Sequence, residues 1–289
     1  MQRDDGLRLL AVHAHADDET ITMGGTMALY AESGVRVANV CCTDGQLATI
    51  VDPDMAAREE EIRPRLAGIR RDELRAACAL LGVTDVHFLG YRDSGMAGAP
   101  STQEREAFWQ ADLDEVVGRL VAIMRGFRPH VVVTYDAYGA YGHPDHIQTH
   151  RATLLALEAS HLRKLYPEAG EPWKVLKLYY TAFPRSEAQK VIEFSEAAGI
   201  ASPFGATPIE ELDFVADDEG VTTVVDCRAT MGRKVAALRA HVSQIGPDFP
   251  YLVVPEELLV EHFGNEHYGL VITRVPTNLP EDDLFAGVR

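Results

Sequence analysis

The fold is decided at Leu7-Arg8-Leu9-Leu10-Ala11-Val12-His13-Ala14-His15-Ala16-Asp17-Asp18-Glu19, where an apolar run leads directly into closely spaced His and Asp residues. The apolar run at residues 7–12 predicts a buried β-strand. Side chains that follow such a strand lie at its carboxyl end, and open parallel sheets have their binding sites at this edge. The stretch therefore predicts one half of a functional site.

A second stretch of the same kind supplies the other half. The apolar run His130-Val131-Val132-Val133-Thr134-Tyr135 leads through residues 136–142 into His143-Pro144-Asp145-His146. A single His-x-x-Asp pair is more often a surface or capping pair, because Asp favours turns and helix N-caps. Two such clusters, each at the end of a predicted strand, indicate a metal site instead.

The expected metal ligands are His15, Asp18 and His146. Three protein ligands leave one coordination position open, which is typical of a catalytic rather than a structural zinc ion. A His/Asp set without thiolates suits Zn²⁺ and also Fe²⁺, Co²⁺ or Mn²⁺. Asp17 lies beside the ligands and cannot point the same way as Asp18, so it is the expected general base for a metal-activated water.

Three motifs carry a family resemblance. They are His15-Ala16-Asp17-Asp18-Glu19, Gly25-Thr26-Met27-Ala28 and His143-Pro144-Asp145-His146. Through them the chain resembles the PIG-L/LmbE family of zinc-dependent de-N-acetylases, and it is most similar to members that act in mycothiol metabolism. The resemblance covers most of the chain and implies a Rossmann-like fold of the LmbE type. It also implies that His15, Asp18 and His146 hold zinc and that Asp17 is the base.

The resemblance implies roles for further side chains. His143 would donate to the leaving amine or stabilise the oxyanion, and Asp145 would orient His143. Tyr141, on a Gly-flanked loop, would hydrogen-bond the substrate carbonyl or its oxyanion. Arg70 and Asp93 match positions that bind sugar or polyol hydroxyls. For Arg70 the alternative is a solvated helix face, because it opens a run of charged residues.

The implied reaction removes the acetyl group from an N-acetylglucosamine-type amide such as N-acetylglucosaminyl-inositol. The alternatives are a mycothiol S-conjugate amidase, a deacetylase of another N-acyl amino sugar, and a non-catalytic sugar-binding protein. Thr22 stands where the amidase carries Lys, which disfavours the amidase. Two further positions depart from the family pattern: Gln46 replaces the usual Glu, and Ala16 replaces the usual Pro. Binding alone needs no base beside a metal, which argues against the non-catalytic alternative. No Gly-x-Gly-x-x-Gly follows the first strand, which disfavours a dinucleotide-dependent dehydrogenase.

Composition limits the partners and the compartment. The net charge of −17 argues against nucleic acid and anionic membranes, because such binding neutralises phosphates with cations. The expected partner is a small-molecule N-acetyl amino sugar, and the oligomeric state is left open. The four cysteines have no Cys-x-x-Cys spacing and lie in apolar segments, which indicates reduced thiols and a cytoplasmic location. The sequence shows neither a membrane-spanning run of about 20 apolar residues nor a signal peptide.

Strands and helices alternate along the chain, which predicts an α/β fold: a doubly wound, mainly parallel sheet with a C-terminal α+β elaboration. Strands are expected at residues 7–13, 35–42, 86–89, 130–135, 174–181, 222–227 and 267–275. Helices are expected at residues 22–33, 66–81, 112–127, 145–162, 187–198 and 229–242. Residues 1–182 would form the catalytic core, and residues 183–289 would complete the sheet edge and a wall of the pocket. The long loops at 44–63 and 91–111 are expected to be lids or binding loops.

Overall fold

The computed structural model describes residues 6–199, 202 and 204–289, and over these residues the chain forms one seven-stranded sheet. The strands are β1 (Arg8–His13), β2 (Arg36–Thr43), β3 (Asp85–Tyr91), β4 (Val131–Thr134), β5 (Lys177–Ala182), β6 (Thr223–Asp226) and β7 (Asn265–Thr273). Their order is β3-β2-β1-β4-β5-β7-β6, with the first five parallel and β7 antiparallel to both of its neighbours. The predicted doubly wound, mainly parallel sheet is confirmed.

The central strands are buried on both faces, which explains their continuous apolar sequences. Every residue of β1 is buried, as is every residue of β4. A parallel strand with helices on both sides has no solvent-facing side, so it shows no alternation of polar and apolar residues. The apolar runs at the start of both site motifs are therefore the centre of the sheet.

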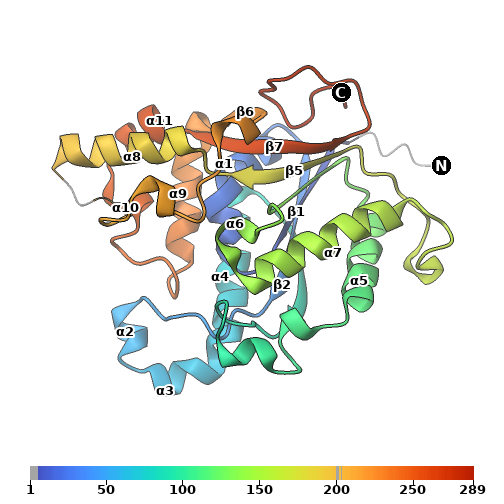
Figure 1. The fold of residues 1–289 in the computed structure, drawn as a ribbon, viewed down its shortest axis with the longest axis horizontal. Coiled ribbons are helices and arrows are strands. Elements are labelled where there is room, and N and C mark those ends of the chain that lie inside the picture. Colours follow the sequence, from blue (N-terminus) through green and yellow to red (C-terminus); the bar gives the residue numbers. More distant parts are fainter. Residues whose placement is uncertain (1–5, 200–201, 203) are drawn as a thin grey trace.

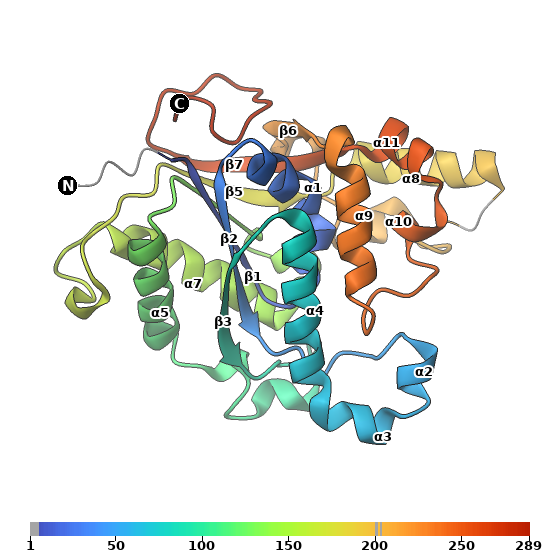
Figure 2. The same cartoon turned by 180° about the vertical axis from the view of Figure 1, so that it is seen from behind.

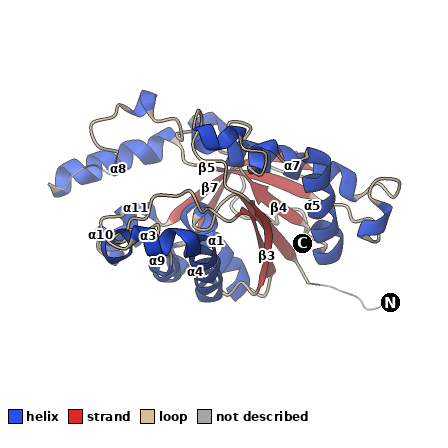
Figure 3. Cartoon of the chain, turned by 90° about the horizontal axis from the view of Figure 1, so that it is seen from below, coloured by secondary structure: helices blue, strands red, loops and turns tan. Residues whose placement is uncertain are grey.

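Helices cover the two faces of the sheet. Helices α1 (Asp18–Glu32), α4 (Leu66–Leu81) and α9 (Met231–Ala240) pack on one face, as the view from behind shows (Figure 2). Helices α5 (Leu113–Phe127) and α7 (Pro144–Ser160) pack on the other (Figure 1). The view from below shows the strands between these two helical layers (Figure 3). The sheet thus separates two apolar cores.

The site motifs lie where the direction of the winding reverses. Strands β1 and β4 are neighbours, with Leu9 opposite Val131 and Ala11 opposite Val133. The helix after β1 is α1 on one face, whereas β4 leads through the short α6 (Gly139–Gly142) into α7 on the other face. The chain therefore diverges above the carboxyl ends of these two strands, which is the position where open α/β sheets bind ligands.

The C-terminal part of the chain extends the same sheet. Strands β6 and β7 join it beyond β5, and this part of the chain also contains α8 (Arg185–Ala198) and the helices α10 (Pro250–Val253) and α11 (Glu256–Phe263), which contact α9. Most elements lie close to their predicted bounds, but α11 was not predicted and α1 begins at Asp18 rather than at residue 22. The loop at 44–63 contains the short helices α2 (Pro53–Ala56) and α3 (Glu59–Ile62). Among the described residues, no helix is long and apolar enough to cross a membrane.

A buried ion pair supports a kink in α1. The helix is interrupted at Met23, whose φ of −146° and ψ of 21° are not helical. The carboxylate of Glu266 accepts hydrogen bonds from the backbone amides of Gly25 (2.9 Å) and Thr26 (2.7 Å), so it caps the second half of the helix. The ammonium group of Lys234 donates to the same carboxylate at 2.7 Å, and the opposite charge lowers the pKa of Glu266 against the effect of burial.

Replacing Lys234 by Met should therefore destabilise the fold strongly, because it leaves the Glu266 charge buried without its counter-ion. We expect a loss of about 3–5 kcal/mol in the free energy of unfolding, measured by urea denaturation. The control is Arg163→Ala, which breaks the exposed ion pair with Glu171 and should leave the midpoint nearly unchanged. Equal midpoints for the two variants would show that the buried pair does not support the helix.

Candidate metal centre and active site

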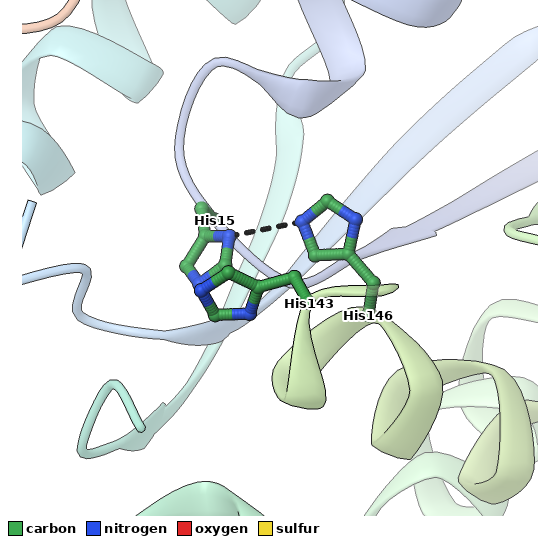
Figure 4. Close-up of side chains that lie close together, drawn as sticks. All are labelled: His15, His143 and His146. Carbon is green, nitrogen blue, oxygen red and sulfur yellow. Dashed lines mark hydrogen bonds between the residues drawn. The ribbon is translucent and has the colours of Figure 1, made fainter. Parts of the chain in front are cut away.

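Three donor atoms converge above the ends of β1 and β4. His15 follows β1, Asp18 is the first residue of α1, and His146 lies in the first turn of α7. The Nδ1 atom of His15 lies 3.2 Å from Nε2 of His146 (Figure 4). The Oδ2 atom of Asp18 lies 3.4 Å from each of these nitrogens. The three residues expected to be metal ligands thus form a compact triangle of donor atoms.

The triangle has the dimensions that a divalent ion requires. Zinc binds His nitrogen and carboxylate oxygen at about 2.0–2.1 Å, and tetrahedral ligands at these distances are about 3.3–3.4 Å apart. The three observed separations of 3.2, 3.4 and 3.4 Å match this spacing. Asp18 remains partly exposed, which leaves access to the open side of the triangle. The residues therefore fit a single metal ion with one open coordination position.

Asp145 contacts a different histidine from the expected one. Its Oδ2 atom lies 3.2 Å from Nε2 of His15 and accepts a hydrogen bond from the backbone amide of Ser94 at 3.0 Å. This carboxylate was expected to orient His143, but Nδ1 of His143 accepts the backbone amide of Asp145 instead. Although burial lowers the pKa of His15, its hydrogen bonds to Asp145 and Asp18 raise it well above the usual value. A carboxylate behind a ligand imidazole fixes its ring orientation.

A second, looser group of donors lies on the far side of His15. Donor atoms of His15, Asp93, His143 and Asp145 all lie within 4.8 Å of one another. Asp93, however, is buried, and its oxygens accept hydrogen bonds from the amides of neighbouring loop residues. Its Oδ1 atom lies 3.9 Å from Nε2 of His15, farther than any separation within the first triangle. The first triangle is therefore the better site for a metal ion.

Asp17 sits on a strained turn directly beside the triangle. Its φ of 110° is rare for a residue other than glycine, and such backbone costs about 1–3 kcal/mol. Arg70 stabilises the turn by donating to the carbonyl of Ala16 at 2.6 Å and to that of Gly45 at 2.8 Å. Its guanidinium also lies 3.4 Å from the Asp17 carboxylate. Burial, opposed by Arg70 and assisted by Asp18, raises the pKa of Asp17 to about 6.

The position of Arg70 excludes one of the two alternatives given for it, the solvated helix face. The side chain is neither on a solvated helix face nor open to solvent, because the residue is only 3% exposed. Its observed contacts are with the carbonyls of Ala16 and Gly45 and with the Asp17 carboxylate. Binding of a sugar hydroxyl by Arg70 therefore stays a prediction.

His143 and Tyr141 flank the triangle on the side of α7. His143 is the N-cap of that helix, and its Nδ1 atom accepts the backbone amide of Asp145 at 3.1 Å. Burial and the nearby His15 lower the pKa of His143 to about 3, so the neutral ring carries its proton on Nε2. The ring of Tyr141 lies 4.9 Å from that of His146, and 38% of the residue is exposed. Burial of the phenol and the charges of Asp18 and Asp17 raise the pKa of Tyr141, so it keeps its proton.

Tyr135 is a site residue that the sequence analysis did not identify. Its hydroxyl donates to Oδ2 of Asp18 at 2.6 Å and accepts the backbone amide of Ala14 at 2.8 Å. Its ring stacks on His146, with centroids 4.1 Å apart and an angle of 14°. One side chain thus contacts two of the three expected ligands. Its position at the end of the second apolar run was the available signal.

Solved structures with the same fold catalyse different reactions. One neighbour is N,N'-diacetylchitobiose deacetylase from Pyrococcus horikoshii, with a TM-score of 0.61, 24% identity, and coverage of 92% of this chain and 84% of that one. Another is 4-carboxy-2-hydroxymuconate hydratase from Pseudomonas putida, with a TM-score of 0.60, 19% identity, and coverage of 94% and 99%. At these identities the likeness shows the fold alone.

Proteins related in sequence identify the family of this chain, which the solved structures do not. The 1D-myo-inositol 2-acetamido-2-deoxy-alpha-D-glucopyranoside deacetylase of Geodermatophilus obscurus is 46% identical over 97% of this chain and 98% of its own length. The family model described as PIG-L, GlcNAc-PI de-N-acetylase, matches residues 10–157, which include the whole donor triangle. The expected resemblance is confirmed: the chain belongs to the PIG-L family of de-N-acetylases.

Proposed function

We propose that the protein is a metal-dependent deacetylase that hydrolyses the N-acetyl amide of N-acetylglucosaminyl-inositol, releasing acetate and a free amine. The observation that carries this proposal is the donor triangle with the Asp17 carboxylate beside it, in a chain of the PIG-L family. The substrate follows from the relative that shares 46% of its residues with this chain over nearly the whole length of both. The extent of that similarity favours it over an amidase or another amino-sugar deacetylase.

The metal in this proposal is held by His15, Asp18 and His146. Zinc is the first candidate, because two imidazoles and a carboxylate with one open position form a typical catalytic zinc site. The same donors accept Fe²⁺. When bound, the metal lowers the pKa of a coordinated water to about 7 and polarises the amide carbonyl.

Asp17 acts as the base and then as the acid. Its pKa of about 6 leaves the carboxylate ionised at neutral pH, yet basic enough to accept the proton of the attacking water. The protonated carboxyl then gives this proton to the leaving nitrogen when the C–N bond of the tetrahedral intermediate breaks. Arg70 orients the carboxylate through their 3.4 Å contact.

His143 and Tyr141 stabilise the oxyanion of the intermediate. The neutral His143 ring carries its proton on Nε2, because Nδ1 accepts a backbone amide. This assignment makes His143 a hydrogen-bond donor in the reaction rather than the source of the proton for the amine. The Tyr141 hydroxyl is the second donor. Hydrogen-bond donors that are already in position when the negative charge develops stabilise a tetrahedral intermediate effectively.

The proposed function is tested by measuring acetate release from N-acetylglucosaminyl-inositol and from N-acetylglucosamine, after the metal has been stripped and Zn²⁺ or Fe²⁺ added back. We expect metal-dependent release, much faster from the inositol glycoside. No release from either substrate, with metal bound, would contradict the proposal and favour an amidase. Equal rates would contradict the inositol part alone.

Asp17→Asn should abolish most turnover without loss of metal. Removing a positioned base costs about 10²–10⁴-fold in kcat, and Asn keeps the size and the hydrogen-bonding shape of the side chain. Metal content, measured by atomic absorption, should match that of the wild type. A variant that loses its metal would identify Asp17 as a ligand.

Tyr135→Phe should weaken metal binding. The change removes the hydrogen bond to Asp18 while keeping the ring that stacks on His146. We expect a 10–100-fold increase in the Kd for Zn²⁺, measured by competition with a chelating dye. Tyr138→Phe is the control, because Tyr138 is 53% exposed. An unchanged Kd for Tyr135→Phe would show that its hydroxyl does not support the metal site.

A further inference from the structure

The strained turn at Asp17 depends on bonds from outside the turn. A residue with a φ of 110° reverts to an ordinary backbone conformation unless its neighbours hold it. Arg70 donates to the carbonyl of Ala16, which is one end of the peptide group that precedes Asp17. At the other end of the same peptide group, the backbone amide of Asp17 donates to Oε2 of Glu19 at 3.1 Å. The Glu19 carboxylate is therefore one of the two groups that hold this peptide segment.

Glu19 is in turn held by a residue from the C-terminal part of the chain. Its other oxygen, Oε1, accepts the hydroxyl of Thr20 at 2.6 Å and lies 3.1 Å from Nε2 of His241. His241 directly follows α9 and is separated from Glu19 by 222 residues. Glu19 and His241 are both fully buried, at 0% exposure. A buried carboxylate needs a partner of this kind, so His241 fixes where the Glu19 carboxylate lies.

We infer that Glu19 and His241 form a positioning pair that fixes the backbone of Asp17 and so aims its carboxylate at the substrate. The pair lies outside the metal triangle and acts on the reaction only through Asp17. The inference rests on the proposed function, because it takes Asp17 as the base. It also assigns a task to the C-terminal part of the chain, which supplies none of the ligands.

The arrangement predicts a selective loss of turnover. Without His241, the Glu19 carboxylate keeps the hydroxyl of Thr20 but loses its partner from the C-terminal part of the chain, so we expect it to shift and to weaken its bond to the Asp17 amide. A displacement of a reacting group by about 1 Å can cost 10²-fold in rate, so we expect kcat to fall by about 10–100-fold. The three expected ligands keep their own contacts, and KM and the Kd for Zn²⁺ should therefore stay within about two-fold of the wild-type values.

The test compares His241→Asn with His241→Gln. The amide nitrogen of Gln reaches the place of Nε2 and can donate to Glu19, whereas that of Asn is too short to do so. The control is Ser243→Ala, which removes a 2.7 Å hydrogen bond to the buried Glu73 from the same segment of the chain. Each variant is measured for kcat, KM and Zn²⁺ affinity with the proposed substrate.

A second readout does not depend on activity. Hydrogen exchange, followed by mass spectrometry on a peptide covering residues 14–19, reports the protection of the Asp17 amide. We expect faster exchange and a lower kcat in His241→Asn, with wild-type behaviour in His241→Gln and Ser243→Ala. Wild-type exchange in His241→Asn, or equal losses in the Asn and Gln variants, would overturn the inference. If the wild type releases no acetate, the proposed function fails, and the exchange data still decide whether the pair holds the turn.

Discussion

The pairing of β1 with β4 is the constraint on which the site depends. These strands are adjacent in the sheet but far apart in the sequence, and the chain leaves them toward opposite faces. Because the two connections diverge, a crevice opens above the carboxyl ends of β1 and β4, and the two polar motifs meet in it. In a sheet wound in one direction, both connections would leave toward the same face, and no crevice would open between them.

The site contains several buried or half-buried carboxylates, and most of them have a histidine partner. Asp18 faces two imidazoles, Asp145 faces His15, and Glu19 faces His241. Buried carboxylates are tolerated only with such partners, because removing a charge from water is costly. Asp17 has the weakest compensation, because its nearest cation is the Arg70 guanidinium at 3.4 Å and His241 acts on it less, and it alone among these carboxyls has a raised pKa. The chemistry assigned to Asp17 thus follows from the way charge is distributed around it.

Much of this arrangement could be predicted from the sequence, because local pattern determines it. The apolar runs of β1 and β4 identify the central strands, and the polar residues after them identify the edge where the donor atoms of His15, Asp18 and His146 converge. Helix α4 ends at Leu81 as predicted, since Gly82 adopts the left-handed conformation that terminates helices. The early start of α1 was missed because its Asp-Asp-Glu sequence resembles a loop, although acidic side chains favour the first turn of a helix.

The remaining contacts could not be predicted, because they join distant parts of the chain. The hydrogen bond from Tyr135 to Asp18 spans 117 residues, and that between His241 and Glu19 spans 222. Neither spacing leaves a periodic signal. The change of partner at Asp145 has a local cause: the N-cap role of His143 uses its Nδ1 atom for the helix backbone. His143 thus contacts Asp145 as expected, but through the backbone amide of Asp145 and not through its carboxylate.

The strand order has a consequence for synthesis on the ribosome. Strand β7 is inserted between β5 and β6, so β6 has no partner in the sheet until residues near the end of the chain have emerged. Until then β5 is an edge strand with unpaired amides and carbonyls, the kind of surface that promotes association between nascent chains. Of the seven described strands, β7 is the last to be translated, so the open edge of β5 is paired only after residues 265–273 have been made.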